Sequence, residues 1–262
     1  MPSPRLFLAA LLLLLAGCAS LSPPAADGWR PLAPGLAYRA WVPWPDSEVQ
    51  ALRVDLDRVR VALSPPAEAG QALDQMASGR GALASVNASF FDKQFRPRGL
   101  TVSDGQPWPQ TLKAPAAARD PLLACDATCS IRFDAPAVPE PGWRMAVSGT
   151  PWLVRDGQPR TAADDATCAN LCANTHPRTA VGLDASGRQL IVLLAVGRRS
   201  EVRGLTLAQT AQLLRELGAV QAFNLDGGGS STLLIGGESR LPRPLNEPAL
   251  RRVANALHLM PR

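Results

Sequence analysis

The most informative segment of this 262-residue sequence reads Phe223-Asn224-Leu225-Asp226-Gly227-Gly228-Gly229-Ser230-Ser231-Thr232-Leu233. An apolar run typical of a buried strand leads into one carboxylate, three glycines and three hydroxyl side chains. Each glycine in a sheet costs about 0.5–1 kcal/mol relative to alanine, so a run of three indicates close approach of a ligand to the backbone. Successive amides can also form an anion-binding nest. The alternative is a tight turn between two strands, with Asp226 as its Asx residue.

Outward from this segment, the sequence pattern indicates many strands and few helices. A helix is expected over 206–217, because Thr206 can cap it, four apolar side chains share one face and Gly218 can end it. A second, shorter helix is expected over 71–78. Alternating or short apolar runs predict strands at residues 38–42, 51–56, 58–63, 82–87, 99–103, 131–133, 152–154, 179–183, 190–196, 220–225, 231–235 and 254–260.

These elements predict one α+β domain, built on twisted mixed or antiparallel β-sheet with few helices. The first three strands are expected to form an antiparallel meander. The helix over 206–217 is expected to cross between the strands at 190–196 and 220–225. The proline-rich stretches 107–121 and 136–141 are expected to be surface loops.

The charge pattern gives little support to a nucleic-acid partner. The chain has 27 Lys plus Arg against 22 Asp plus Glu, for a formal net charge of +5. Only Lys93 and Lys113 are lysines, so 27 − 2 = 25 of the cations are arginines. Apart from the pairs Arg198-Arg199 and Arg251-Arg252 they are scattered, and no basic stripe alternates with aromatic residues. We therefore expect no nucleic-acid partner.

The first residues have the pattern of a secretory signal. Arg5 precedes an apolar run over 6–15, which is shorter than the roughly 20 residues that a membrane-spanning helix needs. The tetrad Leu15-Ala16-Gly17-Cys18 resembles the lipobox of bacterial lipoproteins. The alternative is an ordinary signal peptide with a chance cysteine.

This pattern predicts a lipoprotein signal peptide over 1–17, lipidation of Cys18, a lipidated tether over 18–35 and a folded domain over 36–262. Ala19-Ser20, with no Asp after the cysteine, is similar to the sorting pattern of Gram-negative outer-membrane lipoproteins. The expected place is therefore the periplasmic side of the outer membrane, with the lipid anchor as the membrane contact.

Four further cysteines, Cys125, Cys129, Cys168 and Cys172, form two C-x3-C motifs. An even number in an oxidising compartment predicts two disulfides, and the sequence leaves all three pairings open. A four-thiolate zinc site is the alternative, although its ligands usually come as C-x2-C or C-x4-C.

Several kinds of site are excluded by their missing residues. With His176 and His258 as its two histidines, the chain has neither an H-E-x-x-H motif nor a three-histidine zinc cage. It also lacks a P-loop lysine motif and a G-x-S-x-G elbow. A divalent cation at Asp226 is conceivable, but no acidic cluster surrounds it in sequence, so we expect no metal and no cofactor.

Residues 224–233 resemble the NLDGGGSST signature of the phosphodiester glycosidase family. Two more segments support the resemblance in the same order: residues 86–91 are similar to its N-G-G-F-F segment, and residues 177–182 to its P-R-T-A-I-G segment. The resemblance runs from about residue 50 to the end. It implies a hydrolase that cleaves a sugar 1-phosphodiester, with a cell-envelope or exopolysaccharide glycan as the expected substrate. One departure, Ala88-Ser89 in place of two glycines, favours the alternative of a non-catalytic glycan-binding lipoprotein.

The resemblance also implies roles for individual residues. Cleavage at the anomeric carbon needs a cation for the phosphate and a carboxylate near the developing oxocarbenium ion. Asp226 is expected to act as nucleophile or general base. Arg178 is expected to hold the phosphate with two nitrogens, unless it is paired with a carboxylate under the sheet. Asn87 is expected to bond a sugar hydroxyl or the phosphate.

A wider set of residues is expected to bind substrate: Thr179, Gly227, Gly228, Gly229, Ser230, Ser231, Asp92, Asn255 and Arg252. Asp92 is the candidate for an acid. Arg252 and Asn255 either line the cleft or tie down the C-terminus. His176 could donate a proton, but a loop histidine is more often solvated, and His258 is expected to be a partly buried structural residue.

Overall fold

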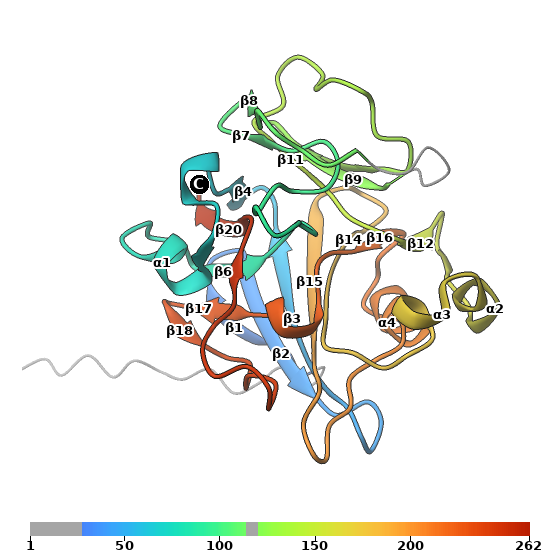
Figure 1. The fold of residues 1–262 in the computed structure, drawn as a ribbon. Helices are drawn as coiled ribbons and strands as arrows, with labels where there is room; N and C mark the ends of the chain where they lie inside the picture. The colour runs from blue at the N-terminus through green and yellow to red at the C-terminus, as the bar shows by residue number, and fades with distance from the viewer. Residues whose placement is uncertain (1–27, 114–119) are drawn as a thin grey trace, which may run out of the picture.

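A computed structural model describes residues 28–113 and 120–262. The expected signal peptide, Cys18 and most of the expected tether lie outside the described residues. The described chain forms three antiparallel sheets and one small two-stranded sheet, with few helices (Figure 1). None of the described helices combines the length and the apolar character that crossing a bilayer would require.

The largest sheet has eight strands in the order β1-β2-β3-β15-β14-β16-β12-β13, and each neighbouring pair is antiparallel. The bounds are β1 Arg30–Ala33, β2 Leu36–Trp41, β3 Glu48–Asp55, β15 Gln189–Val196, β14 Arg178–Leu183, β16 Gln221–Asn224, β12 Trp152–Arg155 and β13 Gln158–Pro159. The central strand β15 is buried from Leu190 to Val196 because both faces of this sheet are covered.

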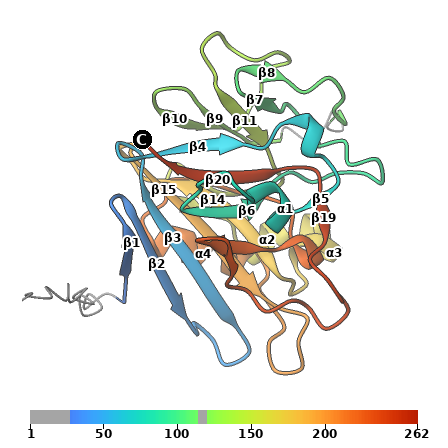
Figure 2. The ribbon, with the colours of Figure 1, turned by 90° about the vertical axis from the view of Figure 1, so that its left-hand side faces the viewer.

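The second sheet has the order β18-β17-β6-β20-β4 and places the C-terminal strand β20 between β6 and β4 (Figure 2). Its strands are β18 Glu238–Ser239, β17 Leu233–Ile235, β6 Ala84–Asn87, β20 Ala256–Pro261 and β4 Val59–Leu63. The expected meander is therefore wrong for its third strand, since β4 pairs with β20 rather than with β3. Alternation in sequence identifies a strand but does not identify its partner.

The third sheet has the order β10-β9-β11-β7-β8 and lies at the top in Figure 1. Its strands are β10 Cys129–Arg132, β9 Leu122–Cys125, β11 Met145–Ser148, β7 Val102–Ser103 and β8 Gln106–Pro107, and β19 Arg252–Val253 pairs separately with β5 Gln71–Ala72. The main core lies between the three sheets, where Leu52, Val192, Val86, Leu257 and Leu123 are fully buried.

The long helix forms where the sequence predicts it. Helix α4 spans Leu207–Glu216, the Thr206 side chain accepts from the Gln209 amide at 3.1 Å, and Gly218 follows with a φ of 101°. It joins β15 to β16, which flank β14 and therefore run parallel to each other. The expected crossover is confirmed.

The remaining helices are short: α1 Leu73–Ala77, α2 Ala162–Asp165 and α3 Ala169–Cys172. Helix α1 begins later than the expected residue 71 because Gln71–Ala72 pairs with β19. Helices α2 and α3 were not predicted, and together with α4 they cover the outer face of the large sheet (Figure 1).

Some sequence boundaries move in the structure. Arg30–Ala33, inside the segment expected to be a tether, forms β1 and pairs with β2. Strands β9 and β11 were not predicted, because four-residue buried runs carry no alternation. Residues 136–141 form the expected loop, whereas the other expected loop includes positions 114–119, outside the described residues.

Both predicted disulfides form, and each C-x3-C motif closes on itself. Cys125 pairs with Cys129 across the β9–β10 hairpin, and Cys168, just before α3, pairs with Cys172, the last residue of α3. The structure therefore shows two disulfides in place of the alternative, a four-thiolate zinc site.

Candidate active site

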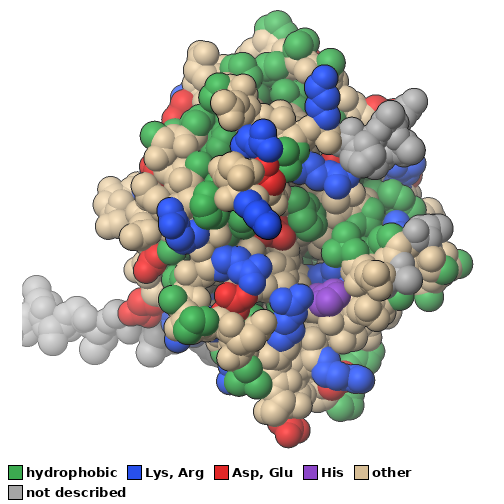
Figure 3. Space-filling model, in the orientation of Figure 1, with side chains coloured by type: hydrophobic (Ala, Val, Ile, Leu, Met, Phe, Trp, Pro, Cys, Tyr) green, Lys and Arg blue, Asp and Glu red, His purple; other side chains and the backbone are tan. Residues whose placement is uncertain are grey.

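The signature segments meet where central strands of the large sheet begin or end, around a cavity of about 220 Å³. The end of β15, the start of β14 and the end of β16 lie together there because these neighbours are antiparallel. The cavity is lined by Phe90, Leu171, His176, Arg178, Arg198, Asn224, Asp226, Gly227, Gly228, Gly229 and Arg251. Figure 3 shows basic side chains around a hollow beside a histidine on this face. A larger hollow of about 600 Å³ beside the Cys125–Cys129 disulfide contains none of the signature residues.

Asp226 lies two residues beyond the end of β16 and is half-buried in the cavity wall. Its amide donates to the Ala88 carbonyl at 2.9 Å, and its own carbonyl accepts from Asn87 Nδ2 at 2.6 Å. Burial raises the pKa of the Asp226 carboxyl to about 6, although the Ser230 hydroxyl, the Gly227 amide and nearby arginines oppose that rise. Asp226 is therefore ionised at neutral pH but close to its midpoint.

The Ser230 hydroxyl is buried at 1% exposure beside this carboxyl. It makes no hydrogen bond of full geometry within the described residues, yet it is close enough to Asp226 to lower that carboxyl's pKa. The Ser231 hydroxyl lies 3.4 Å from Thr179 Oγ1 instead. Neither serine lines the cavity.

The three glycines are required by three different close approaches. A Cβ on Gly227 would lie 2.6 Å from the Pro177 carbonyl oxygen, and one on Gly229 would overlap the Glu247–Arg251 ion pair. Gly228 has a φ of +59° and lies against the Arg198 guanidinium. Its amide donates to Pro177 O at 2.8 Å, so the expected nest of open amides is partly occupied by protein.

Arg178 differs from the sequence expectation. Its side chain is 1% exposed, Nε donates to Leu205 O at 2.9 Å, and Nη2 donates to two further backbone carbonyls at 2.7 and 2.8 Å. Burial lowers its pKa to about 10, so the guanidinium stays charged at neutral pH. The two nitrogens that were expected to hold a phosphate hold backbone instead, and the alternative of a carboxylate partner under the sheet is not seen either.

Two other arginines line the cavity and were not predicted as site residues. Arg198 follows β15 with a φ of 55°, and Arg251, which precedes β19, is paired with Glu247. Both belong to the adjacent arginine pairs that stand out in the sequence. That clustering was the available signal, but it could not show which arginine of each pair faces the cavity.

His176 is a fixed part of the cavity wall rather than a solvated loop residue. Its Nε2 lies 3.1 Å from the Asn170 carbonyl, and its Nδ1 lies 3.3 Å from Arg198 Nη2. A carbonyl can only accept and a guanidinium can only donate, so the ring carries its proton on Nε2 and is neutral. Burial, together with the charges of Arg178 and Arg198, lowers the pKa of His176 below its usual value.

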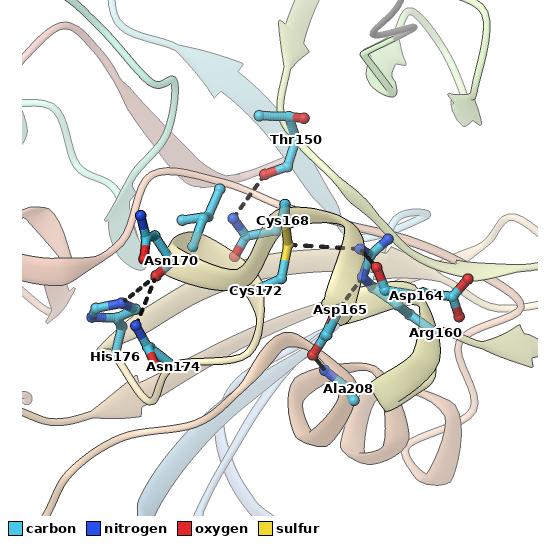
Figure 4. The surroundings of a disulfide bond; sticks show 12 residues. Thr150, Arg160, Asp164, Asp165, Cys168, Asn170, Cys172, Asn174, His176 and Ala208 are labelled. Carbon is cyan, nitrogen blue, oxygen red and sulfur yellow. Dashed lines mark hydrogen bonds and ion pairs between the residues drawn. A yellow bond between two sulfur atoms is a disulfide. The ribbon is translucent and has the colours of Figure 1, made fainter.

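The Cys168–Cys172 disulfide lies in the segment that shapes this wall (Figure 4). The carbonyls of Asn170, Leu171 and Asn174 hold the side chains of His176 and Arg178. The same segment is anchored by a buried ion pair in which Arg160 Nε lies 2.7 Å from Asp165 Oδ1, and Asp165 Oδ2 accepts from the Ala208 amide of α4.

Three of the predicted residues lie behind the cavity wall. Asn87 is 1% exposed, and its Oδ1 accepts from Thr179 Oγ1 at 2.9 Å and from the Thr232 amide at 3.1 Å. Asn255 Oδ1 accepts from the Ser89 amide at 2.9 Å. The structure brings these side chains to the signature segments, where they position the loops and do not line the cavity.

Two predicted residues point elsewhere. Asp92 accepts from Arg96 Nε at 2.8 Å in an exposed turn, and Arg252 packs over the Phe95 ring at 5.3 Å. Neither lines the cavity, because adjacent chain positions place their side chains in different directions. His258 is fully buried and bonds Ser85 Oγ through Nδ1 at 2.8 Å, so it is a structural residue, more deeply buried than expected.

The departure at Ala88-Ser89 causes no backbone strain. Among the described non-glycine residues, positive φ occurs at Phe95, Asp104, Asp156 and Arg198. Ala88 and Ser89 therefore have conformations that side chains ordinarily adopt, and Ala88 is fully buried. Within the described part of the chain, no three His, Cys, Asp or Glu side chains are grouped so that they could hold a metal ion.

A protein-family model described as phosphodiester glycosidase matches residues 80–260, which include all of these segments. The chain belongs to the phosphodiester glycosidase family. The match begins later than the expected residue 50, so β3 and β4 precede it.

Among curated relatives of this family member, the SPbeta prophage-derived uncharacterized protein YomE of Bacillus subtilis strain 168 is 31% identical over 171 residues. That alignment covers 62% of this chain and 26% of YomE. The N-acetylglucosamine-1-phosphodiester alpha-N-acetylglucosaminidase of Mus musculus is 39% identical over 101 residues, 35% of this chain and 19% of the mouse protein. The family member thus spans about a quarter or less of these relatives.

The fold is shared with solved structures. The catalytic domain of zebrafish N-acetylglucosamine-1-phosphodiester alpha-N-acetylglucosaminidase, auto-inhibited by its pro-peptide, aligns with a TM-score of 0.70 at 22% identity, covering 88% of this chain and 85% of that one. A putative exported protein from Burkholderia pseudomallei aligns with a TM-score of 0.61 at 20% identity, covering 82% and 74%. At these identities the likeness concerns the fold.

Proposed function

We propose that this phosphodiester glycosidase family member hydrolyses a sugar 1-phosphodiester, breaking the bond between the anomeric carbon and the phosphate oxygen. One observation carries the proposal: a single carboxylate with a raised pKa, Asp226, shares a small cavity with the guanidinium groups of Arg178, Arg198 and Arg251. Such a cavity suits a substrate with a phosphate anion beside a carbon that becomes positive in the transition state.

The arginines would act on the phosphate. Arg198 and Arg251 present guanidinium groups to the cavity, and Arg178, whose Nε and Nη2 donate to backbone carbonyls, contributes a fixed positive charge from the cavity wall. When the C–O bond breaks, its electron pair stays with the departing phosphate monoester, whose negative charge increases. Cations placed beforehand at that position stabilise the charge as it develops.

Asp226 would act on the sugar side. Within the described cavity lining it is the single carboxylate. As an ionised group it either takes a proton from an attacking water or itself attacks the anomeric carbon. The first route inverts the anomeric configuration. In the second, water then hydrolyses the glycosyl ester formed on Asp226, and the configuration is retained. Proton NMR of the sugar as it is released distinguishes the two routes.

The biological substrate that we propose is a cell-envelope or exopolysaccharide glycan, reached from a lipid anchor on the periplasmic side of a Gram-negative outer membrane. The signal pattern over 1–17 and the lipobox-like Cys18 support this placement. Two disulfides are also what an oxidising compartment favours.

The test is hydrolysis of a panel of sugar 1-phosphodiesters, N-acetylglucosamine 1-phosphate esters first, by the full chain secreted into an oxidising compartment. The wild type should release sugar, whereas Asp226→Asn should lose about 100- to 10,000-fold in turnover while still binding. A folded wild type that releases no sugar from any ester would overturn catalysis. Glycan binding that persists equally in both proteins would then favour the alternative of a glycan-binding lipoprotein.

A further inference from the structure

Asn224, the last residue of β16, has a buried oxygen that no protein group satisfies. Its side chain is 1% exposed and lines the cavity, and Oδ1 has no hydrogen-bond partner among the described residues. The other buried side-chain atoms without partners belong to residues outside the cavity lining. A buried carbonyl left without a donor costs free energy, and at the cavity wall a bound ligand can supply that donor.

The orientation of the Asn224 amide follows from its neighbours. Nδ2 donates to the Thr150 carbonyl at 2.9 Å, and a carbonyl can only accept, so the nitrogen must face Thr150. The backbone of Asn224 is also held, because its amide donates to Pro151 O at 3.0 Å and its carbonyl accepts from the Thr150 amide at 2.8 Å. Oδ1 is therefore held on the side away from Thr150.

Asn224 Oδ1 differs in hydrogen-bonding capacity from the other polar groups of the cavity. Arg178, Arg198 and Arg251 are donors, and both ring nitrogens of His176 are already bonded. Asn224 Oδ1 is thus a neutral acceptor beside the charged groups. Asn224, the last residue of β16, and Asp226, two residues beyond it, both line the same cavity.

We infer that Asn224 forms a sugar subsite, in which Oδ1 accepts a hydrogen bond from a neutral donor on the sugar ring next to the bond that Asp226 helps to break. The donor is a hydroxyl or an acetamido N–H group, and the subsite selects sugars that carry one at that position. This inference rests on the proposed function, since it names the part of the substrate that the same cavity recognises.

The test combines substrate and protein changes in one cycle. The probes are methyl phosphodiesters of N-acetylglucosamine, glucose and the monodeoxyglucoses, and the variant is Asn224→Leu, which has a similar size and no acceptor. The wild type should cleave one deoxy sugar about 10- to 100-fold less efficiently than its parent, and Asn224→Leu should lose that preference. Comparison of the acetamido and hydroxyl sugars shows which donor is used.

Gln221→Leu is the matched control. Gln221 lies on the same strand and its Oε1 atom is also buried without a partner, but it does not line the cavity. Its variant should keep the wild-type preference. If Asn224→Leu does not fold, as judged by melting temperature, Asn224→Ser takes its place, because a serine hydroxyl is too short to reach the same donor.

Each outcome decides the inference. An equal loss of kcat/KM on every sugar in the Asn224 variant would show a structural role and overturn the subsite. If the wild type cleaves none of the probes, hydrolysis fails, and the same comparison is made on the binding of the sugar 1-phosphates by calorimetry. A preference lost in Asn224→Leu would still support the subsite, while no binding, or an unchanged preference, would overturn it.

Discussion

Asn87 Nδ2 donates a hydrogen bond at 2.6 Å to the backbone carbonyl of Asp226, a residue 139 positions further along the chain. The same amide accepts from Thr179 and from the Thr232 amide, so one buried side chain holds three signature segments in register. Asn87 ends β6 in the second sheet, and Asp226 follows β16 in the large sheet. This bond therefore joins the two sheets at the cavity.

Asn87→Ala should destabilise the fold by roughly 2–4 kcal/mol, because it leaves the Asp226 carbonyl and the Thr232 amide without this partner. Turnover should fall as well, since Asp226 is no longer held. Urea unfolding and kcat/KM measure the two effects. Asn174→Ala is the control, because the Asn174 side chain is exposed and makes a single long bond of 3.5 Å. Equal stability in the two variants would contradict the role given to Asn87.

Asp226→Asn should stabilise the protein while removing turnover. The folded-state pKa is raised to about 6 from an ordinary 3.8, so between those values the folded protein binds more protons than the unfolded chain. Stability contributed by this group therefore falls as pH rises through that window, and the full cost, on the order of 2–3 kcal/mol, is present above it.

The variant should accordingly melt higher than the wild type at pH 7.5 and at nearly the same temperature at pH 4. Wild-type activity should rise with pH as Asp226 ionises, with an apparent midpoint near its pKa of about 6. A melting temperature that drops at pH 7.5 in Asp226→Asn would count against the buried ionised carboxylate.

Arg251→Gln and Arg252→Gln form a matched pair of neighbours. Arg251 lines the cavity, whereas Arg252 packs over Phe95 and donates to the Gly70 carbonyl. Loss of a cation that holds the phosphate should raise KM about 10- to 100-fold for Arg251→Gln. Arg252→Gln should keep KM within about twofold and lower stability by roughly 1 kcal/mol. A raised KM in Arg252→Gln, with an unchanged KM in Arg251→Gln, would contradict this placement of the phosphate.

Arg178→Lys should fold poorly despite keeping the charge. The guanidinium satisfies three backbone carbonyls from a site that is 1% exposed, and an ammonium cannot reproduce that fork. We expect a loss of roughly 2–4 kcal/mol in the free energy of unfolding. A stable Arg178→Lys protein with a raised KM alone would instead restore Arg178 as a direct phosphate ligand.

The two disulfides should differ in their effect on activity. Removing Cys168 and Cys172 by alanine substitution releases the segment whose carbonyls hold His176 and Arg178, so kcat/KM should fall about tenfold or more. Removing Cys125 and Cys129 affects a hairpin that contributes no residue to the cavity lining, so it should lower the melting temperature while leaving kcat/KM nearly unchanged. Equal loss of activity in both double variants would show that the effect is global.

Local sequence was sufficient for the features whose causes are local. The Thr206 cap, the apolar stripe and Gly218 bound α4, and the glycine run marks a place where the backbone is approached closely. The signature segments predicted the family for the same reason, since each is a short continuous motif. By contrast, the partner of β4 is β20, almost two hundred residues away in the chain. Alternation in the sequence carries no information about that pairing.

The roles of the individual polar residues could be assigned only from the folded structure. Sequence identified Asp226, and the structure places it in a cavity wall, where burial, which no motif encodes, raises its pKa. Sequence chose Arg178 and Arg252, whereas the cavity is lined by Arg178, Arg198 and Arg251. Hydrogen bonds to backbone carbonyls of other segments, such as Leu205 for Arg178 and Gly70 for Arg252, decide which guanidinium nitrogens are occupied. Those bonds exist only once the strands have paired, and this is why the three-dimensional arrangement, and not the motif, assigns these residues their tasks.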